Sequence, residues 1–465
     1  MKLLILLTGL VAALLIGSDQ RAGAVAAGNI YYVAPTGDDA NPGTQSQPWR
    51  TIQHAADTLA AGDTIYIRAG TYPERVIPQN SGSAGQYITY AVYPGEKATI
   101  DGSSITLPDT LAGLFDILDQ SYIRVAGLRV INAGPYDNNA AILVHNSSYI
   151  IVENNHTANT SSSGIGIWAS DHITADGNTI EQAGIRLYQE CLTVAETSWF
   201  EIKNNEVSNG HKDGICVKDN AANGQVYRNH VYQVQGVGIY VDSWNRHTHD
   251  IAVFQNIVHD NGNDGLALAS EEGGTLENVY VYNNMGYHNR YNALNVSING
   301  EAQHHPISNV QVINNTFYNN GWAGGVGGIL VENPEAQNVV VRNNIVSQNL
   351  YFQLLVALVV PAQHVTIDHN LIDGYRGNVS EGETRGSDYV EGDPLFTNAA
   401  GADFHLQSSS PAIDHGSAVA APGTDSDGQA RPTGAGYDIG ADEYVPFTSF
   451  VYLPVASKNG TPARR

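Results

Sequence analysis

Two acidic side chains in the middle of the chain have the type and spacing that cleavage of a glycosidic bond requires. Asp242 ends the string GIYVD (238–242), and Glu271 stands two positions after the end of the related string GLALA (265–269). Hydrolysis needs one carboxyl group that protonates the leaving oxygen and a second that acts as a nucleophile or activates water. If the two strings lie on adjacent turns of a coil, their Cβ atoms are roughly 8 Å apart. Flexible side chains then allow the retaining or the inverting separation, about 5 or about 9 Å.

Lys218 supports a different reaction at the same place. A polysaccharide lyase removes the proton beside a uronate carboxyl with a Lys, Arg or His base, and neutralises that carboxyl with calcium or another cation. Lys218 ends the string GICVK (214–218) and is the candidate base, with Asp213, Asp219 and Asp242 as candidate calcium ligands. Hydrolysis requires no cofactor. A non-catalytic glycan-binding surface protein is the third alternative, and the residues alone do not choose among the three.

Both strings belong to a repeat that predicts the fold. Short runs of β-forming residues ending in Asn recur at intervals of 23 to 31 residues, and the Gly-aliphatic strings share this period. Several short strands per period, without helical periodicity, predict an all-β, right-handed parallel β-helix. One Asn per turn can hydrogen-bond to its neighbours above and below, so we expect a structural ladder. It comprises Asn155, Asn178, Asn205, Asn229, Asn256, Asn284, Asn315, Asn344 and Asn370.

The alternation along each strand predicts which side chains lie outside the coil. Ile239 and Val241 face the core, so Tyr240 and Asp242 face outward. The same phase gives an external column of Trp168, Ala195, Lys218, Asp242, Ala269, Ser297 and Glu332. Aromatic rings and carboxylates on one external face suit a bound sugar chain. The candidate substrate-binding residues are Trp168, Glu196, Tyr240, Trp244, Arg246, His247, Glu272 and Glu332.

Three segments resemble known β-helix proteins. The strings YYVAPTGDDANPG (31–43) and DTIYIRAGTYPE (63–74) resemble the capping segment of secreted proteins of the pectin-lyase-like β-helix superfamily. Residues 393–444 resemble the C-terminal segment of bacterial secreted β-helix proteins. Residues 237–274 resemble the catalytic turns of a β-helical β-xylosidase family, in which an Asp ends one strand and a Glu ends the corresponding strand of the next turn. This resemblance implies that Asp242 is the nucleophile and Glu271 the acid/base. The Glu stands two positions later here, and Glu272 is an alternative acid.

The two ends of the chain complete the predicted organisation. Lys2, an apolar run over 3–16 and small residues near position 24 predict a secretory signal over 1–27, and therefore a secreted protein. We expect an N-terminal cap and first coils over 28–100, with an amphipathic helix over 51–61. The β-helix core with its groove follows over 101–380, then C-terminal coils and a cap over 381–444, and a tail over 445–465.

Composition excludes several classes of partner. Lys and Arg total 22 against 46 Asp and Glu, a formal charge of −24, which disfavours binding to nucleic acid. After the signal, no run approaches the roughly 20 apolar residues that span a bilayer, so we expect no membrane span in the mature chain. Cys191 and Cys216 are offset in the predicted register, which predicts two free thiols. We expect a monomer that binds a poly- or oligosaccharide.

Overall fold

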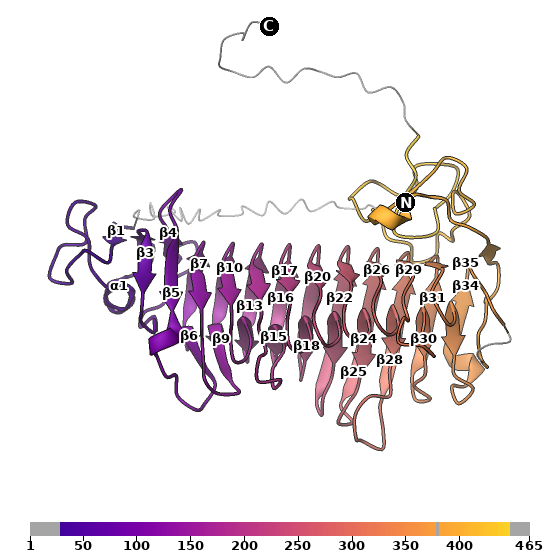
Figure 1. The fold of residues 1–465 in the computed structure, drawn as a ribbon, viewed down its shortest axis with the longest axis horizontal. Coiled ribbons are helices and arrows are strands. Elements are labelled where there is room, and N and C mark those ends of the chain that lie inside the picture. The colour runs from indigo at the N-terminus through magenta and orange to yellow at the C-terminus, as the bar shows by residue number, and fades with distance from the viewer. Residues whose placement is uncertain (1–27, 378–380, 447–465) are drawn as a thin grey trace, which may run out of the picture.

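The protein is an elongated parallel β-coil, as the repeat predicts. The computed structural model describes residues 28–377 and 381–446. Three sheets run along the coil, and most turns contribute one strand to each of them (Figure 1). Strand pairs within these sheets are parallel. The chain bends between strands at left-handed residues such as Asn154 (φ 52°) and Asn159 (φ 56°), a conformation that Asn adopts more readily than most residues.

The strands fall into three stacks, which we call sheets I, II and III. Sheet I contains β1 (Ile30–Val33), β2 (Thr64–Ile67), β4 (Ile88–Val92), β7 (Ser121–Ala126), β10 (Ser148–Glu153), β13 (Asp171–Asp176), β16 (Ser198–Lys203), β19 (Ala222–Tyr227), β22 (His247–Phe254), β25 (Thr275–Tyr282), β28 (Ile307–Ile313), β31 (Gln337–Arg342) and β34 (Val365–Asp368). Sheet II contains β3 (Gly70–Tyr72), β5 (Ala98–Asp101), β8 (Arg129–Ile131), β11 (His156–Ala158), β14 (Thr179–Glu181), β17 (Glu206–Ser208), β20 (His230–Tyr232), β23 (Ile257–His259), β26 (Met285–Tyr287), β29 (Thr316–Tyr318), β32 (Ile345–Ser347), β35 (Leu371–Asp373) and β36 (Val390–Glu391).

Sheet III carries the predicted site. It contains β6 (Ala112–Leu118), β9 (Asn139–His145), β12 (Ile165–Trp168), β15 (Leu192–Ala195), β18 (Ile215–Lys218), β21 (Ile239–Asp242), β24 (Leu266–Ala269), β27 (Leu294–Val296), β30 (Ile329–Val331) and β33 (Leu354–Val356). The register pairs Trp168 with Ala195 and Ala195 with Lys218, and it pairs Asp242 with Ala269. These pairs agree with the external column that the sequence predicts.

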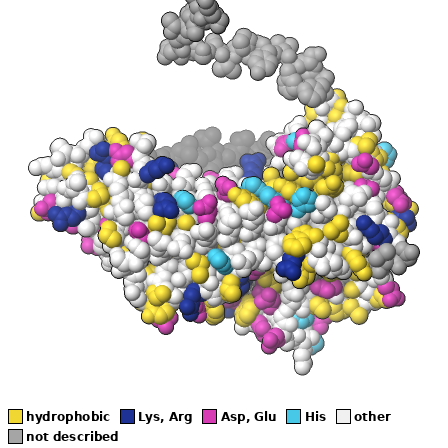
Figure 2. All heavy atoms as spheres, viewed as in Figure 1, with side chains coloured by type: hydrophobic (Ala, Val, Ile, Leu, Met, Phe, Trp, Pro, Cys, Tyr) yellow, Lys and Arg dark blue, Asp and Glu magenta, His cyan; other side chains and the backbone are white. Residues whose placement is uncertain are grey.

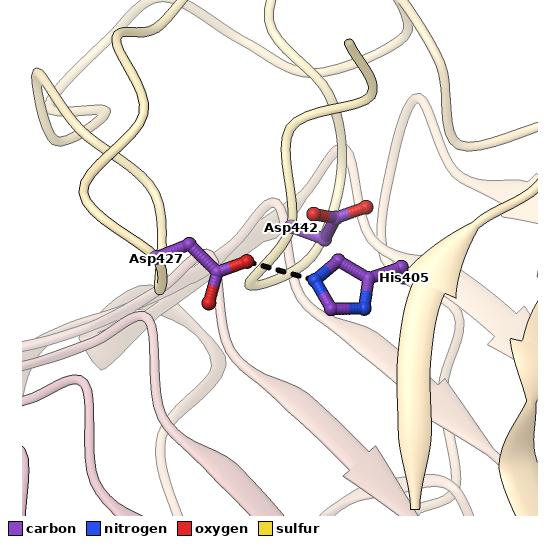
Figure 3. A group of neighbouring side chains, drawn as sticks. All are labelled: His405, Asp427 and Asp442. Atoms are coloured by element: carbon purple, nitrogen blue, oxygen red, sulfur yellow. Dashed lines mark hydrogen bonds and ion pairs between the residues drawn. The ribbon is translucent and has the colours of Figure 1, made fainter. Parts of the chain in front are cut away.

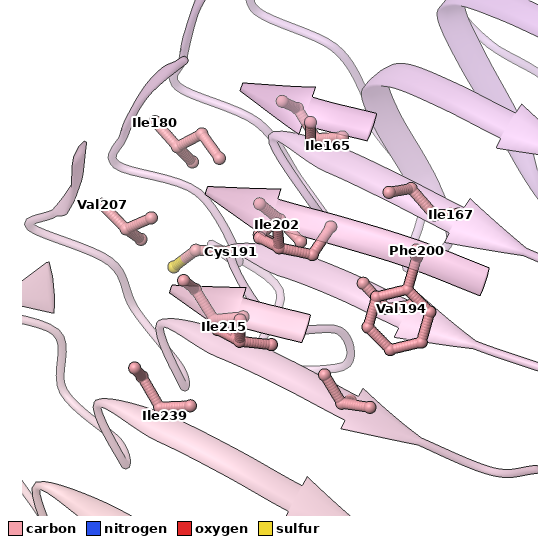
Figure 4. Packing of buried hydrophobic residues seen from close by; sticks show 14 of the residues in the cluster. Ile165, Ile167, Ile180, Cys191, Val194, Phe200, Ile202, Val207, Ile215 and Ile239 are labelled. Carbon is pink, nitrogen blue, oxygen red and sulfur yellow. The ribbon is translucent and has the colours of Figure 1, made fainter. Parts of the chain in front are cut away.

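The core lies between the three sheets and consists of stacked aliphatic side chains. Figure 4 shows Ile165, Ile215 and Ile239 from three turns of sheet III, with Ile202 of sheet I in the same core. The predicted Asn ladder is confirmed: Asn229 Nδ2 donates to Asn256 Oδ1 at 3.0 Å, and Asn256 Nδ2 donates to Asn284 Oδ1 at 2.9 Å. A second ladder, beyond the predicted one, runs through Asn261, Asn289, Asn320 and Asn349.

The N-terminal end of the coil is covered by helix α1 (Ile52–Thr58) (Figure 1). Thr51 caps it by accepting a hydrogen bond from the His54 backbone N–H at 3.2 Å. The helix is shorter than the predicted 51–61, because Leu59 already has an extended backbone with ψ 144°. Ile52, Ala55 and Leu59 are buried against the first strands. Single turns of 3-10 helix lie at Gly102–Ser104, Ala362–His364 and Ala399–Gly401.

The C-terminal segment, residues 393–446, packs against the side of the later turns. It contains the antiparallel pair β37 (Phe396–Asn398) and β38 (Asp403–Leu406) and lies beside the last strands of sheets I and II in Figure 1. Phe396, Phe404 and Ile439 form a cluster with Ile345 of β32 and Leu371 of β35. No helix in 28–377 or 381–446 is both long enough and apolar enough to cross a membrane. The predicted signal and most of the predicted tail lie outside the described residues.

Candidate active site

A cleft of about 470 Å³ lies on the outside of the coil where strands of sheet III end. It is lined by Trp168, Leu187, Tyr188, Gln189, Glu190, Lys212, Asp213, Cys216, Lys218, Asp219, Tyr240, Asp242, Trp244 and Glu271. Strands β12, β18 and β21 each contribute their last residue, because the parallel register stacks equivalent positions. A larger hollow, of about 550 Å³, lies over the first turns, where Arg124 and Glu153 pair with each other. The three predicted catalytic residues, Lys218, Asp242 and Glu271, all line the cleft of sheet III and not this hollow.

Asp242 faces the outside of the coil, as the strand alternation predicts. Ile239 and Val241 pack in the central core, whereas Tyr240 joins Cys216 and Ala267 in a separate cluster outside it. Asp242 is nevertheless only 1% exposed, because the neighbouring turns cover it. Its carboxyl group is thus buried from bulk water while it still lines the cleft.

Glu271 lies directly beside Asp242 on the next turn. Its backbone N–H donates to Asp242 Oδ1 at 3.1 Å, which ties the turn after β24 to the end of β21. The hydroxyl of Tyr240 donates to Glu271 Oε1 at 2.5 Å and orients that side chain. The two carboxyl groups that the sequence separates by 29 residues are therefore neighbours in the cleft.

The environment of Asp242 favours its protonated form. Burial is the main cause, and the charge of Glu271 adds to it; together they raise the pKa of Asp242 to about 7, against the backbone N–H groups of Glu271 and Trp244. A buried carboxylate beside a second carboxylate is costly, so the proton is retained to a higher pH. Near neutral pH, Asp242 can consequently donate a proton and can also exist as the carboxylate.

Two lysines share one buried carboxylate on the other side of the cleft. Lys212 Nζ and Lys218 Nζ each lie 3.0 Å from the Glu190 carboxylate, and Thr193 Oγ1 lies 2.9 Å from Glu190 Oε2. Burial opposes ionisation of Glu190, but the two ammonium groups outweigh it and hold its pKa at about 2. Burial likewise disfavours the charge of Lys218, yet Glu190 and its other neighbours raise the pKa of Lys218 above its usual value. Lys218 is therefore a cation in this arrangement.

Aromatic side chains give the cleft faces on which a sugar ring can stack. Trp168 lies under Lys218, with Nζ 5.8 Å from the centre of the indole ring. Tyr188 is 55% exposed and Trp244 is 40% exposed, and both line the cleft. Exposed aromatic rings at a concave site are suited to the apolar faces of sugars.

Asp213 and Asp219, two of the three candidate calcium ligands, lie at different parts of the cleft. Asp213 accepts a hydrogen bond from the Val237 backbone N–H at 2.7 Å, and burial together with the charge of Glu190 raises its pKa to about 6. Asp219 lies 3.5 Å from the guanidinium of Arg246, which also pairs with Glu196 at 2.7 Å. Within the described ranges, Asp213, Asp219 and Asp242 do not form a compact group of three metal-ligating side chains.

Five of the eight predicted substrate-binding residues do not line the cleft. His247 begins β22 and pairs with Glu277 at 3.2 Å on sheet I. Glu272 is exposed in the turn that follows Glu271, and its backbone N–H donates to the Trp244 carbonyl at 3.1 Å. Glu332 follows β30, three turns beyond Asp242, and accepts from Asn295 Nδ2 at 3.1 Å. Arg246 reaches the cleft through its contact with Asp219, and Glu196 is connected to it only through its pair with Arg246.

The two cysteines are free thiols, as predicted, and the structure gives the reason. Cys191 points into the central core beside Val207 and Ile215 (Figure 4). Cys216 belongs to the cluster outside the core, next to Tyr240. Because the two side chains lie on opposite faces of sheet III, they cannot form a disulfide bond.

The sequence matches two family models and two curated relatives. A model described as Pel9A-like, right-handed β-helix region matches residues 31–230, and one described as right-handed β-helix region matches residues 191–410. The uncharacterized protein YwoF of Bacillus subtilis is 28% identical over 470 residues, covering 88% of this chain and 98% of YwoF. The pectate lyase PEL9 of Emericella nidulans is 36% identical over 124 residues, covering 24% of this chain and 30% of PEL9.

Solved structures share the fold. The structure of XylC in complex with xylose superposes with a TM-score of 0.55 at 15% identity, covering 79% of this chain and 87% of XylC. The pectate lyase Pel9A superposes with a TM-score of 0.51 at 16% identity, covering 90% of this chain and 97% of Pel9A. These matches confirm that the coil is right-handed, as the sequence predicts.

Proposed function

Because this chain is a pectin-lyase-like right-handed parallel β-helix protein, we propose that it cleaves glycosidic bonds in the cleft of sheet III. The proposed reaction is hydrolysis of a poly- or oligosaccharide by Asp242 and Glu271. One observation carries the proposal: two carboxyl groups from adjacent turns are joined by the 3.1 Å bond from Glu271 N–H to Asp242 Oδ1, beside exposed aromatic rings. XylC shares the fold and is seen with bound xylose, which is consistent with a sugar ligand.

The environments of the two carboxyl groups suggest their roles. Asp242, with its pKa raised to about 7 by burial and by Glu271, is suited to give its proton to the leaving glycosidic oxygen. Glu271, oriented by Tyr240, then attacks the anomeric carbon or removes a proton from the attacking water. The bond from the anomeric carbon to the leaving oxygen breaks in this step. This assignment is the reverse of the one that the resemblance to the β-xylosidase family implies.

The charge of the cleft favours a neutral glycan. Glu190, Asp213 and Asp219 add to the two reacting carboxyl groups, whereas Lys212 and Lys218 are held by Glu190. The formal charge of the whole chain is −24, and Figure 2 shows Lys and Arg side chains scattered among Asp and Glu on the face it displays. An acidic cleft repels a polyanionic chain unless a cation lies between them. The predicted signal over residues 1–27 supports action outside the cell.

A calcium-assisted polysaccharide lyase is the second candidate. The match of residues 31–230 to the Pel9A-like model, and the similarity to the pectate lyase PEL9, favour it. In that reaction Lys218 would be the base, with Asp213, Asp219 and Asp242 as calcium ligands. The 3.0 Å pair with Glu190, which keeps Lys218 protonated, is unfavourable for a base. Binding of a cation near Glu190 would have to weaken that pair.

Incubation with a panel of neutral and uronate glycans tests both candidates. Hydrolysis produces reducing ends without unsaturated product, and Asp242→Asn abolishes it, whereas Lys218→Met leaves turnover and weakens binding. Unsaturated ends that absorb ultraviolet light and disappear with chelator would instead establish a lyase. Binding of a glycan without either product would contradict an enzymatic role. Asp109→Asn, an exposed side chain far from the cleft in sequence, is the matched control.

A further inference from the structure

A histidine and two aspartates meet in the C-terminal segment, away from the cleft. His405 lies on β38, Asp427 lies in the turn that follows Asp425, and Asp442 lies near the end of the described chain. Figure 3 shows the three side chains converging from these separate stretches of backbone. One ligand atom from each residue lies within 4.8 Å of the other two.

The imidazole of His405 is oriented as a metal ligand usually is. Its Nδ1 lies 2.6 Å from Asp403 Oδ1, and its Nε2 lies 2.7 Å from Asp427 Oδ2. A carboxylate that accepts from Nδ1–H orients the ring. The Nε2–H donates to Asp427, so a cation at this place would take the position of the Nε2 proton, which is released, and would be shared by Nε2, Asp427 and Asp442.

Asp442 supplies a second, independent observation. The residue is only 5% exposed, and its Oδ2 accepts from the Leu406 backbone N–H at 2.8 Å. Across residues 28–377 and 381–446, no donor hydrogen-bonds to its other oxygen. A cation at this place would give that oxygen a partner. Asp425 is also buried, and its Oδ1 accepts from the backbone N–H groups of Asp427 and Gln429, which fixes the turn that presents Asp427.

We propose that His405, Asp427 and Asp442 bind one divalent transition-metal cation. An imidazole nitrogen with two carboxylates is a donor set that suits Zn²⁺ or Mn²⁺, whereas Ca²⁺ prefers oxygen ligands throughout. The bound cation joins β38 to two turns of the C-terminal segment and so fixes that segment against the later coils. This site does not depend on the chemistry of the cleft.

Zinc binding by the full chain tests the proposal. After treatment with EDTA and its removal, Zn²⁺ is titrated calorimetrically into the wild type, His405→Gln and Asp427→Asn. Both substituted side chains are exposed, so the fold is expected to persist and is checked by circular dichroism. The control is His415→Gln, since His415 is exposed and its ring hydrogen-bonds to the Ile413 carbonyl of its own turn, at 2.6 Å.

We expect the wild type and His415→Gln to bind one more Zn²⁺ per chain than either site variant. This comparison removes the contribution of other surface histidines, such as the pair His230 and His259. Zn²⁺ should also raise the unfolding temperature of the wild type more than that of the variants. Asp403→Asn should weaken binding about 10–100-fold, as loss of a carboxylate behind a histidine ligand does. If the wild type, His415→Gln and the two site variants bound the same number of Zn²⁺ ions, the proposal would be overturned. If the site variants differed from the wild type in binding Ca²⁺ but not Zn²⁺, the choice of a transition metal would be overturned.

Discussion

Substitution of Asp242 by Asn should stabilise the protein at high pH, although it removes a proposed catalytic group. Asn keeps the size of the side chain and an oxygen that can accept from the Glu271 N–H. It removes the negative charge that burial and Glu271 disfavour. Active sites commonly retain such a group at a cost in stability because function requires it.

The size of the effect follows from the pKa of Asp242, which rises from 3.8 to about 7 on folding. The folded state binds the proton more tightly, so the contribution of this proton to stability is complete below about pH 3.8 and is lost as the pH rises through 7. A difference of about 3 pKa units corresponds to roughly 4 kcal/mol. The variant should therefore exceed the wild type by about 1 kcal/mol near pH 4.5 and by roughly 4 kcal/mol near pH 8.5.

Urea unfolding followed by tryptophan fluorescence at the two pH values measures this difference. Asp109→Asn makes the same change of charge at an exposed position, and its stability should match that of the wild type at both pH values. If Asp242→Asn showed no gain at the higher pH, or the same difference at both, Asp242 would not be held in a buried, charge-disfavouring environment. The proposed acid would then have lost its physical basis.

Three further substitutions test the contacts of the cleft and the core. Tyr240→Phe removes the hydroxyl that donates to Glu271, a charged hydrogen bond of about 1.5–3 kcal/mol, so kcat/KM should fall roughly 10–150-fold in a hydrolysis assay. Glu190→Gln leaves two partly buried ammonium groups without their shared, buried carboxylate, and urea unfolding should show a loss of about 3–5 kcal/mol. Asn256→Ala deprives the N–H and amide of Asn229 of their acceptor, and its free energy of unfolding should fall by about 2–6 kcal/mol.

Controls and contrary outcomes differ among these three. Tyr280→Phe changes a partly exposed ring outside the cleft and should leave kcat/KM unchanged; equal losses in both Phe variants would exclude a specific role for the Tyr240 hydroxyl. The effect of Glu190→Gln should diminish as the pH falls from about 4.5 toward 2. The pKa of Glu190 is lower in the folded state, so the wild type loses the stabilisation from its ionised carboxylate over this range. Asn299→Ala, at an exposed position, should be neutral, and a similar loss there would mean that the ladder contributes no special stability.

The sequence predicts the coil and the external column well because both follow from periodicity. Asn256 recurs at the ladder position of its turn, and the phase of GIYVD decides that Asp242 faces outward. Parallel stacking then brings Asp242 beside the next turn, where Glu271 lies. None of these steps requires knowledge of the loops.

The parts that were missed depend on excursions from the repeat. Glu190 lies between β14 and β15 in a stretch that no repeat describes, so its burial between Lys212 and Lys218 could not be read from spacing. Its position at the start of the string ECLTVA (190–195), which has no Gly, is the only available signal. Glu332 shares the parity of the column, but three turns along the axis place it about 14 Å from Asp242. Residues 393–446 fold back on the coil, which brings His405 to Asp427 across 22 positions without any periodic pattern.

Cleavage of a neutral glycan in oxygen-18-labelled water tests the central claim most directly. Hydrolysis breaks the bond between the anomeric carbon and the leaving oxygen and adds water, so mass spectrometry should find one labelled oxygen at each new reducing end. Asp242→Asn should form no product and should therefore incorporate no label. Unlabelled products that are lighter by one water and carry an unsaturated end would contradict hydrolysis by Asp242 and Glu271.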